Sequence, residues 1–196
     1  QAIGGHDPLY APQSKEDSDI FNRFQLNGIK FVQTWEGCVY HMTCRGSRRN
    51  TLDKAKNIYE DSPEWLEQNE RSSRNFIRKW GHFVKHDQLM KPIIPPKYNI
   101  GLILQDNNLD LLKVLEPWCS NIYCDSNLRK HYITVEQDNT SFSLSDRVLP
   151  YNNEKNNNIL IEINGNRFTN EDFNYIQNLS AIIQELLINL NYYLVI

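Results

Sequence analysis

Long apolar runs are missing from this chain of 196 residues. No run approaches the roughly 18 residues that a membrane-spanning helix needs, so we expect no membrane span. A charged-then-apolar leader is also missing, and the chain starts at Gln1, not at a methionine. We therefore expect a processed product or a fragment without a targeting signal. A glycine-rich phosphate-binding loop is likewise not found.

Cysteine is scarce. Cys38, Cys44, Cys119 and Cys124 form two loose pairs without the two-residue gaps that are typical of zinc sites. A secreted disulfide framework would be denser for a chain of this length. We therefore expect reduced, buried thiols and an intracellular, cytoplasmic location.

Charge is unevenly distributed, although the net charge is only −3. Residues 1–44 hold three Lys/Arg against five Asp/Glu, residues 45–97 hold twelve against seven, and residues 98–196 hold six against twelve. The basic middle segment either binds phosphate or meets the acidic parts of its own fold. The hydrophobic fraction of 40% is that of an ordinary globular protein.

A helix start is expected shortly after the N-terminal Gly-Gly turn. Ser14 stands three residues before Asp17, which is the spacing of a capping box, and Gly28 is placed to end the helix. Acidic residues crowd the first turn, where the helix dipole stabilises negative charge, so helix-end electrostatics alone is one explanation of them. These acids are Glu16, Asp17 and Asp19. The expected apolar stripe is Ile20, Phe21 and Phe24.

A strand pair is expected next, because residues 29–35 and 38–42 are rich in β-branched and aromatic residues. A turn at Glu36 and Gly37 separates the two runs. Alternation along the second run places His41 at a strand end.

The basic segment begins with an irregular loop over residues 45–61, and Ser62 and Pro63 then start a helix that we expect to run to about Lys79. Arginines three and four residues apart form one stripe on that helix, either as a solvated face or as a ligand-binding face. They are Arg71, Arg74 and Arg78. The arginines of the preceding loop are Arg45, Arg48 and Arg49.

Residues 92–96 hold three prolines and are expected to form a stiff linker. The segment after it alternates between strand and helix patterns, which predicts a small parallel sheet with right-handed crossovers. The expected strands are 100–105, 121–124, 159–163 and 192–196, the expected helices are 109–117 and 170–190, and residues 125–158 stay unassigned.

Residues 4–46 contain an ordered series of features: a Gly-Gly turn, an acid pair, an arginine, a glycine and a closing histidine. The residues of this series are Gly4, Gly5, Asp7, Glu16, Asp17, Arg23, Gly28, Tyr40 and His41. This order resembles the second, acceptor-side half of a family 2 glycosyltransferase domain, the GT-A fold that uses nucleotide-sugar donors. Beyond Gly46 the chain resembles extensions of glycosyltransferases predicted in phages and large DNA viruses.

The resemblance implies a role for each matching residue. Asp17 would be the general base that takes the proton of an acceptor hydroxyl on a carbohydrate or another molecule, and Glu16 would support it. His41 would bind a divalent metal, Mn²⁺ or Mg²⁺, although a hydrogen-bonded strand-end histidine is an equal alternative. The substrate-binding residues would be Gly5, Asp7, Arg45 and Arg48.

The implied fold class is α/β: a partial GT-A-like segment over residues 1–45, a basic loop-helix extension over 46–97 and a small βα subdomain over 98–196. The family's first half, with its nucleotide-binding layer and Asp-x-Asp metal motif, is not contained in these 196 residues. Asp17-Ser18-Asp19 matches the Asp-x-Asp pattern, but it stands at the position of the family's catalytic base and not at that of the metal motif. We therefore expect weak or no transferase activity from these 196 residues alone.

Three alternatives stay open. One is a carbohydrate- or nucleotide-binding or assembly module with a degenerate glycosyltransferase segment. Another is nucleic-acid binding through the arginines, which the negative net charge and the lack of a groove-reading motif disfavour. The last is half of a metal site at His82 and His86, which share a face only if the segment is helical, against packed or surface histidines.

Overall fold

The computed structural model describes residues 3–32, 34–38, 40 and 61–193. The chain divides into two compact units: residues 1–73 with 86–92, and residues 74–85 with 93–196. One unit boundary falls within a helix and another within the proline-rich segment 92–96. In the described part of the chain, no helix has the length and apolar character that crossing a membrane requires.

The first unit contains helix α1, Glu16–Leu26, which confirms the expected helix. Its start differs from the prediction, because Lys15 is the N-cap residue and no side chain caps the helix. The prediction of a capping box at Ser14 is therefore wrong. Ser14 has a positive φ of 82°, so its backbone does not have the extended conformation of a capping serine. Gly28, with φ 70°, ends the helix as predicted.

The buried face of α1 is polar, which corrects the predicted apolar stripe. Asp19 and Asn22 are buried, whereas Phe21 is 45% exposed. Phe21 instead packs with Phe24 and with Phe31, at ring-centroid distances of 6.1 and 5.5 Å.

The strand pair predicted for residues 29–42 is wrong where the chain is described. Residues 29–32 and 34 form no strand, and Trp35–Gly37 is a short 3-10 helix. Trp35 and Tyr40 are 96% and 97% exposed. β-propensity reflects how a side chain fits a half-buried pleated surface, and these side chains have no such surface. Val39 and residues 41–60 lie outside the described residues.

Helix α2, Pro63–Trp80, begins as the sequence predicts. The Ser62 hydroxyl accepts a hydrogen bond from the backbone N–H of Trp65 at 3.2 Å, and proline occupies the first helical position. The helix starts in the first unit and ends in the second.

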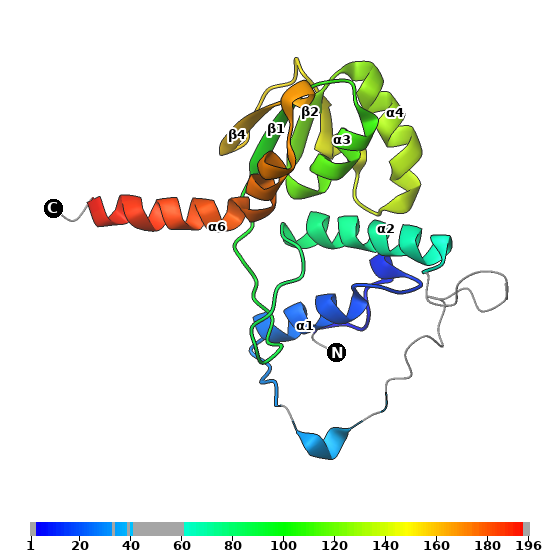
Figure 1. Ribbon diagram of the computed structural model, residues 1–196, viewed down its shortest axis with the longest axis vertical. Coiled ribbons are helices and arrows are strands. Elements are labelled where there is room, and N and C mark those ends of the chain that lie inside the picture. Colours follow the sequence, from blue (N-terminus) through cyan, green and yellow to red (C-terminus); the bar gives the residue numbers. More distant parts are fainter. Residues whose placement is uncertain (1–2, 33, 39, 41–60, 194–196) are drawn as a thin grey trace. The chain divides into compact units, whose positions relative to one another are not determined.

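The second unit is built on a four-stranded sheet in the order β3-β2-β1-β4 (Figure 1). All three strand pairs are parallel, as predicted. The strands are β1 Ile100–Gln105, β2 Asn121–Cys124, β3 Val148–Pro150 and β4 Ile159–Asn164.

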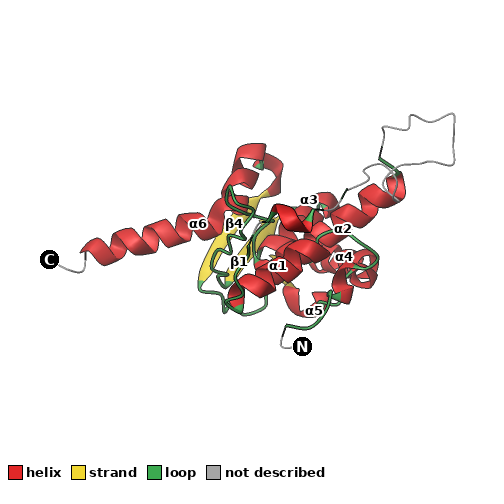
Figure 2. Cartoon of the chain, turned by 90° about the horizontal axis from the view of Figure 1, so that it is seen from below, coloured by secondary structure: helices red, strands yellow, loops and turns green. Residues whose placement is uncertain are grey.

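The helices of this unit are α3 Leu109–Leu115, α4 Ser126–Glu136, α5 Leu144–Arg147 and α6 Asn170–Tyr193. The unassigned residues 125–158 thus contain α4, α5 and β3. The strand predicted over 192–196 is wrong for residues 192 and 193, which continue α6, while 194–196 lie outside the described residues. The C-terminal part of α6 extends away from the sheet (Figure 2).

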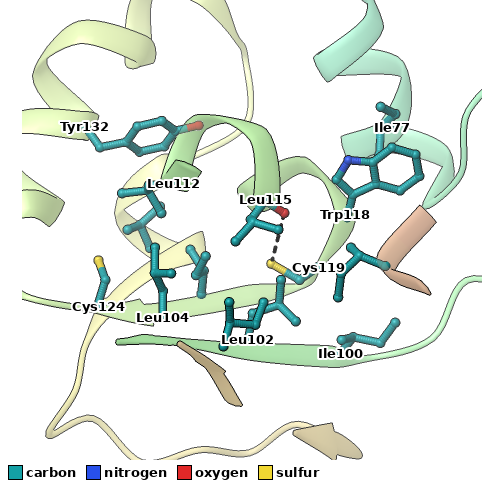
Figure 3. Close-up of a cluster of buried hydrophobic side chains, with 14 of the residues drawn as sticks. Ile77, Ile100, Leu102, Leu104, Leu112, Leu115, Trp118, Cys119, Cys124 and Tyr132 are labelled. Atoms are coloured by element: carbon teal, nitrogen blue, oxygen red, sulfur yellow. Dashed lines mark hydrogen bonds between the residues drawn. The ribbon is translucent and has the colours of Figure 1, made fainter. Parts of the chain in front are cut away.

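The hydrophobic core lies on one face of the sheet. Leu102 and Leu104 of β1 are fully buried, and they face Leu112 and Leu115 of α3 and Tyr132 of α4 (Figure 3). Apolar residues of α6 complete the same cluster. The two described cysteines of this unit, at positions 119 and 124, are buried free thiols, as predicted, whereas the free thiol of residue 38 is exposed.

The opposite face carries the connection from β3 to β4 instead of a helix. Asn157 accepts a hydrogen bond from the Tyr123 hydroxyl at 2.8 Å and donates to the side chains of Asn99 and Asn121 at 2.6 and 2.9 Å. A Cβ on Gly101 would lie 2.5 Å from the Asn157 Oδ1, so only glycine permits this close approach. The connection between β3 and β4 thus packs against this face of the sheet through Asn157.

Candidate functional site

The start of α1 is a sharp turn that presents its acids. Ser14 and Lys15 both have positive φ, at 82° and 75°, and turn the chain directly into Glu16. Asp17 is exposed, and its carboxylate makes no hydrogen bond or ion pair with any described residue. It stands at a helix N-terminus, where free N–H groups and the helix dipole stabilise a negative charge.

Glu16 lies beside Asp17 and is half-buried. Its Oε2 atom is buried without a hydrogen-bond partner in the described part of the chain. Burial lowers the pKa of the neighbouring Lys15 below its ordinary value, against the opposing effect of the Glu16 charge. A buried carboxylate oxygen without a donor is costly, so Glu16 retains an unused acceptor next to the exposed acid.

Asp19, not Asp17, is the acid that the fold uses internally. It is fully buried and accepts hydrogen bonds from Arg23 Nε at 2.9 Å and from the Tyr10 hydroxyl at 3.3 Å. The four-residue spacing of Asp19 and Arg23 is the sequence signal for this pair. Asp17 is thereby left outside the internal ion pair.

Arg23 also holds the Gly-Gly turn against α1. Its guanidinium donates to the backbone carbonyl of Ile3 and to that of Gly5, the latter at 2.8 Å. Gly5 is exposed, and a Cβ placed on it would meet nothing within 4 Å. The turn is therefore fixed from the helix side and open on its other side.

Asp7, a predicted substrate-binding residue, has a structural use. Its Oδ1 accepts a hydrogen bond from the Leu9 backbone N–H at 2.9 Å and caps the 3-10 helix Pro8–Tyr10. That carboxylate oxygen is committed to local backbone structure.

Polar residues in the first half of α2 hold the loop that precedes α1. Asn69 Oδ1 accepts from the Ser14 hydroxyl at 2.6 Å and from Lys15 Nζ at 3.1 Å. Gln68 and Ser72 donate to the Gln13 carbonyl at 3.0 and 3.2 Å. These positioning residues were missed in the sequence, because a polar helix face gives no sign of which distant loop it contacts.

The predicted residues His41, Arg45 and Arg48 lie outside the described residues, as does Arg49. Across residues 3–32, 34–38, 40 and 61–193, no group of three or more His, Cys, Asp or Glu side chains is arranged to hold a metal ion. The described residues do not fit a divalent metal, and no chemical step is assigned to one.

The half metal site at His82 and His86 is not formed. Both residues follow the end of α2, and the segment is not helical, so they share no helix face. His82 is buried, and its Nδ1 lies 2.6 Å from the Phe83 carbonyl, whereas His86 is exposed. Burial is the main cause that lowers the pKa of His82.

Each arginine of the α2 stripe has a partner within the fold. Arg78 is fully buried, with Nε 2.8 Å from Glu116 Oε2 and Nη2 2.9 Å from Glu136 Oε1. Arg74 also binds Glu136, at 2.8 Å. In the first unit, Arg71 donates to the Ala11 carbonyl at 2.6 Å. Arg74 and Arg78 of the basic middle segment thus meet acidic side chains of the fold, whereas Arg45, Arg48 and Arg49 of the preceding loop lie outside the described residues.

The carboxyl ends of the parallel strands carry a second group of polar residues. Asp125 caps α4 by accepting from the backbone N–H groups of Asn127 and Leu128 at 2.8 and 3.2 Å, and these bonds hold its pKa below the ordinary value. The Tyr151 hydroxyl donates to the Leu104 carbonyl, and burial raises its pKa. Each of these groups has a structural partner, so this edge is a weaker candidate site than the start of α1.

Comparison with known proteins gave no match to a family model, to a curated protein or to a solved structure.

Proposed function

We propose that residues 4–26 form part of the acceptor side of an inverting glycosyltransferase, which transfers a sugar from a nucleotide-sugar donor to a hydroxyl group. Asp17 is the general base: its carboxylate takes the hydroxyl proton as the oxygen attacks the anomeric carbon. The observation that carries this proposal is the exposed Asp17 carboxylate, which has no partner among the described residues and stands at the start of helix α1.

The surroundings of Asp17 support this assignment over the neighbouring acids. Asp19 is buried in an ion pair with Arg23, so it cannot reach a substrate hydroxyl. Glu16 lies next to Asp17 and carries the buried, unpartnered Oε2. It is suited to orient a substrate or a water molecule that enters beside the base.

The contacts that fix the start of α1 also support a catalytic role for Asp17. Arg23 binds two carbonyls of the Gly-Gly turn, and Asn69 binds the residues that enter α1. A general base must be held within hydrogen-bond reach of the proton it removes, and a helix start fixed from two sides meets this need. Gly5 leaves the opposite side of the turn open for an acceptor.

The competing functions have less support. Nucleic-acid binding would use the arginines of α2 and of the loop before it. In α2, Arg78 is fully buried and Arg74 is ion-paired, while the loop arginines lie outside the described residues. A binding module with a degenerate transferase segment would bind sugar or nucleotide without using Asp17 as a base. Turnover separates that module from the enzyme.

The test is sugar-nucleotide turnover by the full-length protein that carries these residues. Asp17→Asn removes the basicity of the side chain but little of its volume, and we expect kcat to fall by about 100-fold or more, the usual contribution of a general base. Asp110→Asn is the matched control, because Asp110 is also an exposed acid at the second position of a helix.

We expect the control variant to retain turnover within about twofold, since Asp110 lies outside the proposed site. Retained turnover in the Asp17 variant, with folding verified by circular dichroism, would reject the assignment of the base. Robust turnover by the isolated 196 residues would overturn the proposal that they form only part of the enzyme.

A further inference from the structure

Strand β4 is the edge of the sheet and pairs only with β1 among the described residues. An edge strand presents unpaired backbone N–H and C=O groups, which most proteins protect with charged side chains, lysine above all, with proline, with a bulge or with a covering element. The one charged residue of β4 is Glu162. The sequence ILIEIN of Ile159–Asn164 holds neither lysine nor proline. Six residues in regular register with β1 form a long, unbroken edge.

A cavity of about 290 Å³ lies beside this edge. One wall is residues 161–164, and the other is formed by the start of α6 and the residues before it, including Phe168, Tyr175 and Ile176. Successive side chains of a strand point to opposite faces of the sheet. A cavity that contacts four consecutive strand residues therefore cannot lie on one face alone, and it runs along the backbone at the edge of the strand. The cavity is therefore a groove between β4 and α6, both labelled in Figure 1.

Two charged groups of the groove have no partner within the described chain. The Arg167 guanidinium and the Glu162 carboxylate make neither an ion pair nor a hydrogen bond there. Asp172, the other acid of the groove, is already bound by the Thr169 hydroxyl at 2.7 Å and by the Thr169 N–H at 2.8 Å. The groove thus combines apolar walls with one available cation and one available anion.

We propose that this groove binds an extended peptide segment by strand addition to β4. Backbone groups of the peptide pair with the free edge, an apolar side chain enters between β4 and α6, and a peptide carboxylate binds Arg167. Main-chain pairing supplies affinity in this mode of recognition, and the pockets for alternate side chains supply specificity. The volume lies at the lower limit for small-molecule pockets, about 300–1,000 Å³, which suits a short side chain better than a cofactor.

An array of acetylated heptapeptides of alternating valine and threonine tests the proposal, with each position replaced in turn by aspartate, alanine or lysine. The labelled 196-residue chain is the probe. We expect one position at which aspartate binds about tenfold more tightly than lysine, because only there does the side chain meet the guanidinium. Arg167→Ala is expected to abolish that preference.

Two controls separate charge from backbone pairing. Lys130→Ala removes an exposed cation on α4, which packs against β3 at the other edge of the sheet, and is expected to keep the aspartate preference. N-methylation of alternate peptide residues is expected to abolish binding in one alternate set and spare it in the other, since strand pairing uses every second N–H.

Three results would overturn the proposal. The first is an array in which no peptide binds at millimolar concentration, and the second is equal tolerance of both N-methylated sets. The third is a stable dimer that Glu162→Arg dissociates while peptides do not compete, which would assign the edge to a second copy of this chain.

Discussion

Replacing Arg78 by methionine is expected to destabilise the second unit strongly. The Arg78 side chain is fully buried and donates to Glu116, Glu136 and the Tyr132 hydroxyl, the last at 3.1 Å. Methionine fills much of the same space but carries no charge. The two carboxylates, which are 0% and 1% exposed, then lose the cation that lies between them.

Breaking a buried ion pair by removing one partner costs about 3–5 kcal/mol. Glu116 keeps Arg147, and Glu136 keeps Arg74, so we expect the lower end, about 3 kcal/mol. Urea unfolding of the whole chain, followed by far-UV circular dichroism, measures this loss. The matched control is Arg74→Met, because the side chain of Arg74 is 14% exposed and binds Glu136 alone among the described residues.

We expect Arg74→Met to lower the free energy of unfolding by about 1 kcal/mol, because its ion pair is partly solvated. Equal stability of wild type and the Arg78 variant would refute the view that this network holds α2 to the sheet domain. So would equal losses in the Arg78 and Arg74 variants, since burial would then make no difference.

The same network predicts loss of stability in acid. Burial alone would raise the pKa of Glu116, but Arg78 and Arg147 outweigh it and hold the pKa below the ordinary value. A carboxylate with a depressed folded-state pKa stabilises the fold above its unfolded pKa, about 4.3, and loses this contribution as the pH falls toward the folded value. Urea unfolding at a series of pH values from 7 downward should show this loss. The free energy of unfolding should fall less steeply with pH in the Glu116→Gln variant than in the wild type.

Two further predictions concern close packing and thiol reactivity. Gly165→Ala is expected to lower the free energy of unfolding by about 1–3 kcal/mol in urea, because the added Cβ would lie 2.4 Å from the Cβ of Asp106. Gly5→Ala is the control and should leave the free energy of unfolding nearly unchanged, because a Cβ there meets nothing within 4 Å. Equal effects of the two substitutions would contradict this packing. Burial raises the pKa of Cys119 and of Cys124 to about 12, so iodoacetamide at pH 8 should leave both thiols unmodified in the native protein and alkylate them in urea, as mass spectrometry of peptides will show. Rapid native alkylation of either thiol would contradict its burial.

The sequence predicted the elements that local interactions define. The capping residue Ser62 and the proline after it located the start of α2, and strand patterns that alternate with helix patterns located β1, β2 and β4. These signals act over at most four residues, so they can be read without knowing the fold. The missed α4, α5 and β3 carry weaker patterns. The strands wrongly predicted at the described residues 29–32, 34–35 and 192–193 show that composition without a pairing partner is insufficient.

Only the tertiary structure decided how the charged residues are used. The sequence supplied an acid pair, a nearby acid and a stripe of arginines, and for each it left open whether the charges belong to a ligand site or have only a structural role. Burial selected Asp19 for Arg23 and left Asp17 in solvent, and it joined Arg78 to Glu116, 38 residues away along the chain. The strength of a charge interaction depends on burial and on partners brought together by folding, neither of which is encoded in the local sequence around the charge.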